Sequence, residues 1–281
     1  MTRINELLGK VNRLYISKRT VNGVYLSPLG ESDVQILLPK NQVPSGSEKG
    51  DILEAFIYKD SEDRPVASLK VPPVTLGTVA RLRVKQTTGI GAFLDWGLAK
   101  DLLLPFKEQI GQVKEGNEVL VALYIDKSSR LCATMHIYDY LKTNSPYQEE
   151  DHVTGTVYEI TDSFGVFVAV DNCYSALIPH NELSRNFHIG ETISARVKQI
   201  REDGKLTLSL SEKVPVQMGI DAANILEKCK KAGGFLPFHD KTSPEIIKRE
   251  FGMSKNAFKR AIGRLMKEGI LTITNEGIQI K

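Results

Sequence analysis

The sequence predicts a mainly β chain with a C-terminal α+β part, in which three small tandem β-barrels precede a domain of three helices and a β-hairpin. Residues 1–214 consist of short runs rich in Val, Ile, Leu, Tyr and Phe between Gly, Asp, Asn and Ser, which is typical of strands and turns. One order of elements also repeats about every 70 residues, a period that suits one five-stranded barrel and exceeds a solenoid repeat. A chain of 281 residues with 41% hydrophobic and 25% charged residues is an ordinary globular composition.

The repeat has three copies, each with a Gly-apolar strand, an "LLP" or "LIP" segment, a Gly-acid turn, a long strand, a charged turn and a last strand. The third copy shows this order as "GVFVAV", "ALIP", "GETISARVKQI", "REDGK" and "LTLSLS". We expect a first barrel at 1–72, a second at 73–140, a linker at 141–151 and a third barrel at 152–214, with the C-terminal domain at 215–281.

The C-terminal domain is predicted from helical spacing and helix-end signals. The first helix is predicted in "GIDAANILEKCKKAGG". Its helical spacing puts one side together from Ala223, Leu226 and either Cys229 or Lys230. The second begins with a Ser cap before Pro in "TSPEIIKREFG". The third carries an apolar stripe of Phe258, Ile262, Leu265 and Met266. A hairpin through Asn275-Glu276-Gly277 then completes the order of a winged helix.

The stretch "SFGVFVAV" in the third barrel raises a question of facing. Residues of one parity share a face of a strand, and a closed barrel fills its interior with apolar side chains, so the valines at 166, 168 and 170 point inward and Phe167 outward. Phe164 has the valine parity. It either lies in the core or, if a β-bulge at Gly165 reverses the facing, lies beside Phe167.

Basic residues of the barrels have two interpretations. Residues 153–213 carry 6 basic and 8 acidic side chains, so only a local patch is expected there, or else a solvated mixed face, from Arg196, Lys198, Arg201 and Lys205. In the second barrel "RLRVK" places on one strand face Arg81, Arg83 and Lys85, either to follow a phosphate backbone or to protect a sheet edge. Trp96 is either a core anchor at the barrel rim or a further stacking platform.

Charge is most asymmetric in the C-terminal domain. Residues 215–281 carry 12 basic and 7 acidic side chains, a net charge of +5, and the rest of the chain sums to −2. Five basic residues of the third helix lie outside its apolar stripe: Lys255, Lys259, Arg260, Arg264 and Lys267. Such a helix suits a DNA major groove or a phosphate backbone, although basic winged helices also contact proteins.

Catalytic and metal signatures are absent from the sequence. The three cysteines form no CxxC pair, which argues against a disulfide framework and a zinc site. No HExxH, GxSxG, Walker or GxGxxG motif occurs, and the "EEDH" run at Glu149–His152 lies in a polar linker. We therefore expect no enzyme activity, no catalytic residue, no cofactor and no metal. Without a signal peptide or membrane span, the expected location is the cytoplasm.

The third copy resembles an S1-type RNA-binding domain, an OB-fold barrel, through "GTVYEITDSFGVFVAV", "ALIPHNEL" and "GETISARVKQIREDGKLTLSLS". The second copy is similar in part, and the first mainly in the order of its elements. Three such barrels before a winged helix resemble the conserved virulence factor B (CvfB) family of bacterial RNA-binding regulators. The resemblance implies RNA contacts by two strand aromatics, a His, an Asp and a basic residue.

Carried onto the third copy, these positions are Phe164 and Phe167, Pro179 followed by His180, Arg201 in place of the Asp, and Lys205. On the second copy they are Ile90, Phe93, Pro105, Asp126 and Arg130. The first copy offers Asn22, Tyr25 and Pro39. No copy matches fully, and the third has the best stacking pair.

The expected function is that of a non-catalytic, post-transcriptional regulator of virulence gene expression that holds single-stranded RNA. Aromatic stacking tolerates any base, and several weak sites on one chain raise affinity through effective concentration. Two alternatives stay open: a transcription regulator that binds duplex DNA through the winged helix, and an accessory subunit of an RNA-processing enzyme such as a nuclease.

Overall fold

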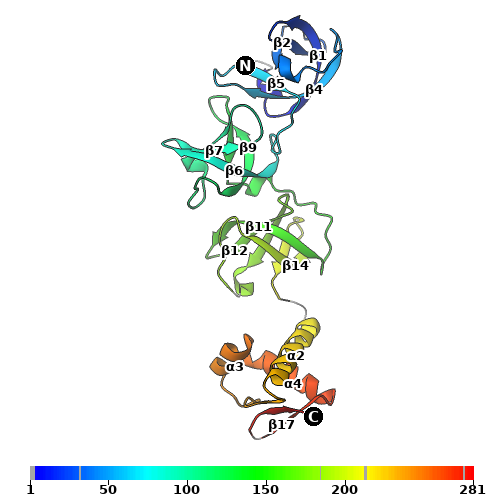
Figure 1. Cartoon of the computed structure of the whole chain (residues 1–281), viewed down its shortest axis with the longest axis vertical. Helices are drawn as coiled ribbons and strands as arrows, with labels where there is room; N and C mark the ends of the chain where they lie inside the picture. The colour runs from blue at the N-terminus through cyan, green and yellow to red at the C-terminus, as the bar shows by residue number, and fades with distance from the viewer. Residues whose placement is uncertain (1–3, 32, 184, 212–213, 275) are drawn as a thin grey trace. The chain divides into compact units, whose positions relative to one another are not determined.

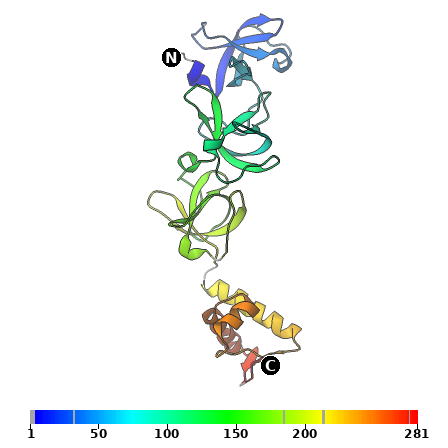
Figure 2. The same cartoon turned by 90° about the vertical axis from the view of Figure 1, so that its left-hand side faces the viewer.

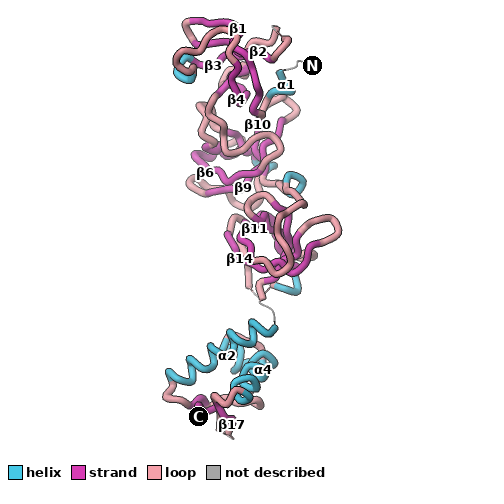
Figure 3. Tube along the Cα trace, turned by 90° about the vertical axis from the view of Figure 1, so that its right-hand side faces the viewer, coloured by secondary structure: helices cyan, strands magenta, loops and turns pink. Residues whose placement is uncertain are grey.

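The chain folds into two compact units, residues 1–210 and residues 211–281. The computed structural model describes residues 4–31, 33–183, 185–211, 214–274 and 276–281. The regular structure of the first unit is mainly strand and that of the second mainly helix, as the magenta and cyan segments of Figure 3 show. The predicted division into a β part and a C-terminal α+β part is confirmed.

The first unit contains three closed five-stranded barrels (Figure 1). The first barrel comprises α1 (Ile4–Leu7), β1 (Val11–Thr20), β2 (Gly23–Pro28), β3 (Ile36–Pro39), η1 (Lys40–Gln42), β4 (Ile52–Lys59) and β5 (Pro65–Ser68). The second comprises β6 (Val79–Thr88), β7 (Gly91–Asp95), β8 (Leu102–Pro105), η2 (Phe106–Glu108), β9 (Glu118–Ile125), β10 (Leu131–Thr134) and η3 (Tyr138–Tyr140). The third comprises β11 (His152–Thr161), β12 (Gly165–Val170), β13 (Tyr174–Pro179), η4 (His180–Glu182), β14 (Thr192–Ile200) and β15 (Leu206–Ser209).

The three barrels share one topology. In each, the first strand pairs antiparallel with the second and the fourth, and the third pairs parallel with the fifth. The pairing of the first strand with the second is also irregular at one residue in every barrel. These residues are Ser17, Lys85 and Tyr158, and the residue after each pairs with the outward aromatic residue of the second strand, Tyr25, Phe93 or Phe167. A bulge bends a strand and increases its twist, which lets one long strand close a small barrel.

The interior of the third barrel follows the predicted alternation. Val166, Val168 and Val170 are each 0–1% exposed and lie in one cluster with Ile178 and Leu206. Strand parity was therefore enough to assign the inward face of β12, and the outward face carries Phe167 and Ala169.

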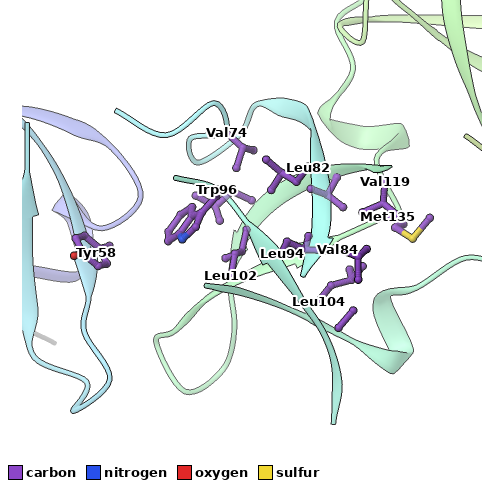
Figure 4. Packing of buried hydrophobic residues seen from close by; sticks show 14 of the residues in the cluster. Tyr58, Val74, Leu82, Val84, Leu94, Trp96, Leu102, Leu104, Val119 and Met135 are labelled. Carbon is purple, nitrogen blue, oxygen red and sulfur yellow. The ribbon is translucent and has the colours of Figure 1, made fainter. Parts of the chain in front are cut away.

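Aromatic side chains join the first and second barrels. Trp96 is 3% exposed, and its ring meets the edges of Phe56 and Tyr58 at centroid distances of 5.8 and 6.3 Å. Its indole N–H donates to the carbonyl of Lys100 at 2.5 Å. Figure 4 shows Trp96 at the edge of the second barrel's core, on the side of Tyr58. The prediction of Trp96 as a core anchor is confirmed, and the core it anchors spans two barrels.

The second and third barrels are joined by a second shared cluster, which includes Leu120, Ala122, Tyr158 and Ala169. Arg81 adds a polar link, because its guanidinium donates to the hydroxyls of Thr156 and Thr192, at 3.0 and 2.8 Å, and to the carbonyl of Gly190 at 3.1 Å. Part of the outward face of β12 is therefore packed against the preceding barrel.

The second unit contains α2 (Val214–Lys231), β16 (Phe235–Leu236), α3 (Pro244–Phe251), α4 (Lys255–Lys267), β17 (Leu271–Ile273) and β18 (Ile278–Ile280). Figure 2 shows the yellow helix α2 beside the orange helices of the same unit. The hydroxyls of Ser243 and Ser254 cap α3 and α4 as predicted. The three helices and the hairpin enclose one core, which confirms the winged-helix order.

The predicted face of α2 is shifted by one position, and the predicted stripe of α4 is wrong only at Met266. Among the described side chains of α2, the buried apolar ones are Ala222, Ile225 and the predicted Cys229, whereas Ala223 is exposed and Leu226 is half-buried. Both sets have helical spacing, so spacing alone did not distinguish them. In α4, Met266 is 43% exposed and Ala261 takes its place in the stripe. Strands β17 and β18 form the predicted hairpin, but Asn275 of its turn lies outside the described residues.

Candidate nucleic-acid interface

Phe164 and Phe167 lie side by side on the surface of the third barrel. Phe164 is 63% exposed and Phe167 is half-buried, with ring centroids 6.4 Å apart and ring planes at 66°. Phe167 rests on the buried Tyr158, whose ring centroid lies 6.0 Å away. A base can stack on exposed aromatic rings that the protein holds in place, and here Tyr158 supports Phe167 while Phe164 is exposed.

The two rings meet because of Gly165, although no β-bulge forms at this residue. β12 keeps a continuous register with both neighbours from Gly165 to Val170, and the irregular position lies on the partner strand at Tyr158. Phe164 lies in the turn before β12. Gly165 adopts a φ of +119°, and a Cβ there would lie 2.2 Å from the carbonyl oxygen of Ile178. Only glycine allows this approach, which directs Phe164 outward.

The main chain of Phe164 is fixed on both sides. Its N–H donates to the hydroxyl of Thr161 at 3.2 Å, and its carbonyl accepts from the N–H of His180 at 3.1 Å. The His180 side chain is exposed at the start of η4. His180 therefore holds the main chain of Phe164 through its own backbone N–H, and its side chain is exposed to solvent.

Tyr138 is a third aromatic residue of this surface, and the sequence did not identify it. It begins η3, at the end of the second barrel, and is 41% exposed. Its ring meets Phe167 edge-on at a centroid distance of 5.9 Å. We call Tyr138, Phe164 and Phe167 the aromatic patch. Chain separation hid the contact, and the only sequence signal was a tyrosine-rich segment between two barrels, "IYDY".

Lys205 supplies a positive charge beside the aromatic patch. Its ammonium nitrogen lies 5.0 Å from the centroid of Tyr138 and donates to the Tyr138 hydroxyl at 3.0 Å. A carboxylate oxygen of Asp203 lies 3.2 Å away on the other side. The Tyr138 hydrogen bond and then Asp203 raise the pKa of Lys205 above its usual value, so the group stays charged. A cation over a tyrosine ring is a stable arrangement that also suits a phosphate.

Other basic residues of the third barrel are bound to carboxylates. Arg196 is paired with Glu150 at 2.9 Å, and Lys198 with Glu182 at 2.6 Å. The hydrogen bond from Lys198 holds the pKa of Glu182 below its usual value, with a further bond from Ser209. Arg201 lies on the same turn as Lys205, with Asp203 3.5 Å away. The structure brings Lys205 to the patch and engages Arg196 and Lys198 elsewhere.

The second barrel presents Phe93 half-buried and Ile90 60% exposed at the matching positions. The Asp126 carboxylate makes its hydrogen bonds within its own turn, where one oxygen accepts from the N–H groups of Ser128 and Arg130 at 2.8 and 2.9 Å. Asp126 is thus placed to order the turn that carries Arg130, while the Arg130 guanidinium reaches Asp63 of the first barrel at 2.6 Å.

The basic stripe of β6 is only partly open. Arg81, Arg83 and Lys85 share the outward face as predicted, while Leu82 and Val84 face the core. Arg81 is bound to the third barrel, and Lys85 pairs with Asp101 at 2.8 Å, a contact that raises the pKa of Lys85. Arg83 is exposed. The stripe is therefore not continuous along the strand, because two of its three charges have protein partners.

The first barrel has the least developed surface. Tyr25 is half-buried on β2, and Asn22 is exposed at the position that Phe164 occupies in the third barrel. The matching charged turn is closed on itself, because Asp60 and Arg64 pair at 2.8 Å.

Helix α4 presents a basic face. Lys259, Arg260 and Lys267 are exposed, and Lys255 at the first position is half-buried. Arg264 pairs with Glu268 one turn away at 2.7 Å. Phe258, Ile262 and Leu265 hold the opposite side in the core, so the helix can offer its charges outward.

Two further features concern metals and membranes. Within the described ranges, no group of three or more His, Cys, Asp or Glu side chains is arranged to hold a metal ion. Among the same residues, no helix has the length and apolarity needed to span a membrane.

Comparison with known families matches nearly the whole chain. Residues 8–70 and 76–136 match the S1 domain, residues 147–211 match the S1 RNA binding domain, and residues 223–280 match the CvfB-like winged helix domain. These are nucleic-acid-binding folds and not enzyme families. The three barrels are therefore S1-type, and the chain is a nucleic-acid-binding protein built from S1 and winged-helix domains.

Relatives match along most of the length. The uncharacterised protein YitL of Bacillus subtilis is 32% identical, over 93% of this chain and 89% of its own length. Conserved virulence factor B of Staphylococcus saprophyticus is 28% identical, over 89% and 87%. A crystal structure of a multidomain protein with nucleic acid binding domains from Streptococcus pneumoniae covers 98% of this chain and 99% of that one, at 24% identity and a TM-score of 0.49.

Proposed function

Because this chain belongs to the conserved virulence factor B family, we propose that it is a non-catalytic RNA-binding protein that regulates gene expression after transcription. The relatives align with this chain over most of their length, so the alignment spans its S1-type barrels and most of its winged helix. The names of the staphylococcal relatives suggest virulence genes as the regulated output.

The aromatic patch is the observation that carries this proposal. Phe164, Phe167 and Tyr138 bring three aromatic rings to one surface of the barrel that matches the S1 RNA binding domain. Stacking of a base on such a ring contributes roughly 1–3 kcal/mol and requires an unpaired base, because a paired base is covered by its neighbours. The patch therefore selects single-stranded RNA without strong base preference.

Electrostatics play a smaller part in the third barrel. Lys205 is the cation placed at the patch, while Arg196 and Lys198 are paired with carboxylates. Salt weakens RNA binding more steeply when the protein neutralises more phosphates. A site with few unpaired cations therefore has a shallow salt dependence. The basic face of α4 adds the charges that respond to salt.

The mechanism is additive binding along one chain. The third barrel holds bases by stacking, the second barrel adds Phe93, Asp126 and Arg130, and the first adds Tyr25. Each later contact is made within one molecule, so weak sites combine into a useful affinity. Helix α4 extends the footprint through Lys255, Lys259, Arg260, Arg264 and Lys267.

The test replaces both rings without shortening the side chains greatly. Phe164→Leu with Phe167→Leu keeps apolar bulk but removes the π-faces, and we expect binding of an eight-nucleotide oligouridylate to weaken about 30-fold or more. Leu29→Ala, which trims a side chain that is 65% exposed on the first barrel, is the control and should bind like the parent. Fluorescence anisotropy measures both. Parent-like affinity in the folded double variant rejects the patch as the RNA site.

A second candidate is favoured by the net charge of +5 on residues 215–281 and the basic face of α4. It is a transcription regulator that binds duplex DNA through the winged helix. Titrating the whole chain with duplex DNA and with single-stranded RNA of equal length separates the two. Tighter binding to duplex DNA, unchanged by the Phe164→Leu and Phe167→Leu pair, favours this candidate.

A further inference from the structure

A cavity of about 250 Å³ lies where the first barrel meets the outer surface of the second. Its apolar floor comes from β7 and β8 of the second barrel, through Phe93 and Leu103, with Ile90 beside them. Its wall includes Tyr58 of the first barrel and Trp96. The floor is thus the surface on which the second barrel would stack a base.

Three cations border this cavity, Lys59, Lys100 and Arg130, together with two carboxylates, Asp63 and Asp101, of which Asp101 is paired with Lys85 outside the cavity at 2.8 Å. Two of the cations are tied across the barrel junction, because Lys59 donates to the carbonyl of Ser129 at 2.7 Å and Lys100 donates to the carbonyl of Asp60 at 2.8 Å. An apolar floor beside a positive rim is suited to a base with its attached phosphate. The volume is below the roughly 300–1,000 Å³ of a drug-sized site, so one nucleotide is the largest unit it takes.

Asp63 already occupies the anionic position at this rim. Its carboxylate lies 2.6 Å from the Arg130 guanidinium and 3.8 Å from the Lys100 ammonium. The hydrogen bond from Arg130 holds the pKa of Asp63 below its usual value, so the carboxylate is charged at neutral pH. A carboxylate between two cations makes the contacts that a phosphate oxygen would make.

Asp63 lies in the charged turn of the first barrel, so its carboxylate reaches the cavity from outside the second barrel. The charged turns of the three barrels each place one residue at positive φ, and these residues are Asp63, Ser129 and Gly204, at 59°, 58° and 79°. Only in the first barrel is this residue acidic. Asp63 thus brings a negative charge from the first barrel to the basic residue of the second.

The ion pair between Asp63 and Arg130 is weak enough for an RNA phosphate to displace the carboxylate. The side chains of Asp63 and Arg130 are 40% and 57% exposed. Exposed ion pairs contribute little to stability, because water solvates both partners well. A polyanion that also gains stacking on Phe93 can therefore replace the Asp63 carboxylate.

We propose that the cavity between the first two barrels binds one nucleotide of single-stranded RNA, and that Asp63 competes with its phosphate for Arg130 and Lys100. The base lies on Phe93 and Ile90, and the phosphate takes the place of the carboxylate. The inference rests on the proposed RNA-binding function and adds a regulated subsite to it. RNA enters the second barrel only after the Asp63 contact opens, so this subsite binds later than the aromatic patch.

The test uses the whole chain and its single tryptophan, because Trp96 lines the cavity and reports on it directly. Asp63→Asn removes the charge and keeps a residue that tolerates positive φ. We expect it to bind the eight-nucleotide oligouridylate about fivefold more tightly by anisotropy, with a larger change in Trp96 fluorescence. Glu62→Gln is the matched control, because it removes the adjacent charge, which pairs with Arg64. It should bind like the parent.

A further variant separates competition from a general charge effect. In an Arg130→Gln background, Asp63→Asn should give no gain, because the cation for which Asp63 competes is gone. Equal gains from Asp63→Asn and Glu62→Gln, or a full gain in the Arg130→Gln background, would overturn the proposal. So would Trp96 fluorescence that stays constant while anisotropy shows saturation. That last result leaves the RNA-binding function standing, whereas an absence of any anisotropy change removes both.

Discussion

Replacing Gly165 by alanine is predicted to damage the third barrel locally. The added Cβ would lie 2.2 Å from the carbonyl oxygen of Ile178 and 2.7 Å from the backbone nitrogen of His180, distances that backbone atoms cannot accept without moving. The φ of +119° is also strained for any residue with a Cβ. The variant must therefore part β12 from β13 where Gly165 pairs with Pro179.

The expected cost follows from these two effects. Strain at positive φ costs roughly 1–2 kcal/mol, and breaking the hydrogen bond between His180 and the Phe164 carbonyl costs roughly another 1 kcal/mol. The local free energy of opening should fall by about 2–3 kcal/mol. Each 1.4 kcal/mol is tenfold, so amide hydrogens of β12 and β13 should exchange roughly 30- to 100-fold faster.

Hydrogen exchange followed by mass spectrometry measures this change peptide by peptide. The control is Gly46→Ala, where φ is also positive, at +79°, but a Cβ would meet no atom within 4 Å. The control should show only the smaller strain effect, within the first barrel. If peptides of β12 and β13 exchange alike in Gly165→Ala and the parent, the close approach does not hold this strand, and the account of how Phe164 reaches the surface is wrong.

Two further predictions concern the joint between barrels and the effect of pH. Arg81→Gln removes the donors to Thr156, Thr192 and Gly190, so it should speed proteolysis of residues 141–151 several-fold; an unchanged cleavage rate would show that apolar packing alone holds the joint. Because the pKa of Glu182 is depressed in the fold, its stabilisation is complete above the unfolded value of 4.5 and is lost as the pH falls through the lower native value. Glu182→Gln should accordingly lower the Tm by about 4 °C at pH 6 and by less at pH 3, and equal losses at both pH values would contradict this.

The repeat carried most of the fold prediction. An order of elements recurring every 70 residues sufficed for three barrels, and strand parity placed the valines of β12 inside. Spacing was less reliable in α2, where the stripes through Ala222 and Ala223 differ by one residue and both suit a helix. Burial in a shared core, which depends on the other helices, decided between them.

The site was predictable only where it is local in sequence. Phe164, Gly165 and Phe167 lie within four residues, so one motif contained them. Tyr138 meets Phe167 and Lys205 from another barrel, and such a contact has no local signal. The same applies to Arg81 and Arg130, whose partners Thr156 and Asp63 lie 75 and 67 positions away. A basic residue in a sequence shows a charge but not whether a protein partner already holds it.

The most direct test of the central claim is to map where RNA touches the whole chain. An eight-nucleotide RNA with a single 4-thiouridine, crosslinked by light and located by mass spectrometry, identifies the residues next to a base. Our account predicts crosslinks in the peptides that contain Tyr138, Phe164 and Phe167, and their disappearance when both phenylalanines are replaced by leucine. Crosslinks confined to α4, with none on the third barrel, would contradict it.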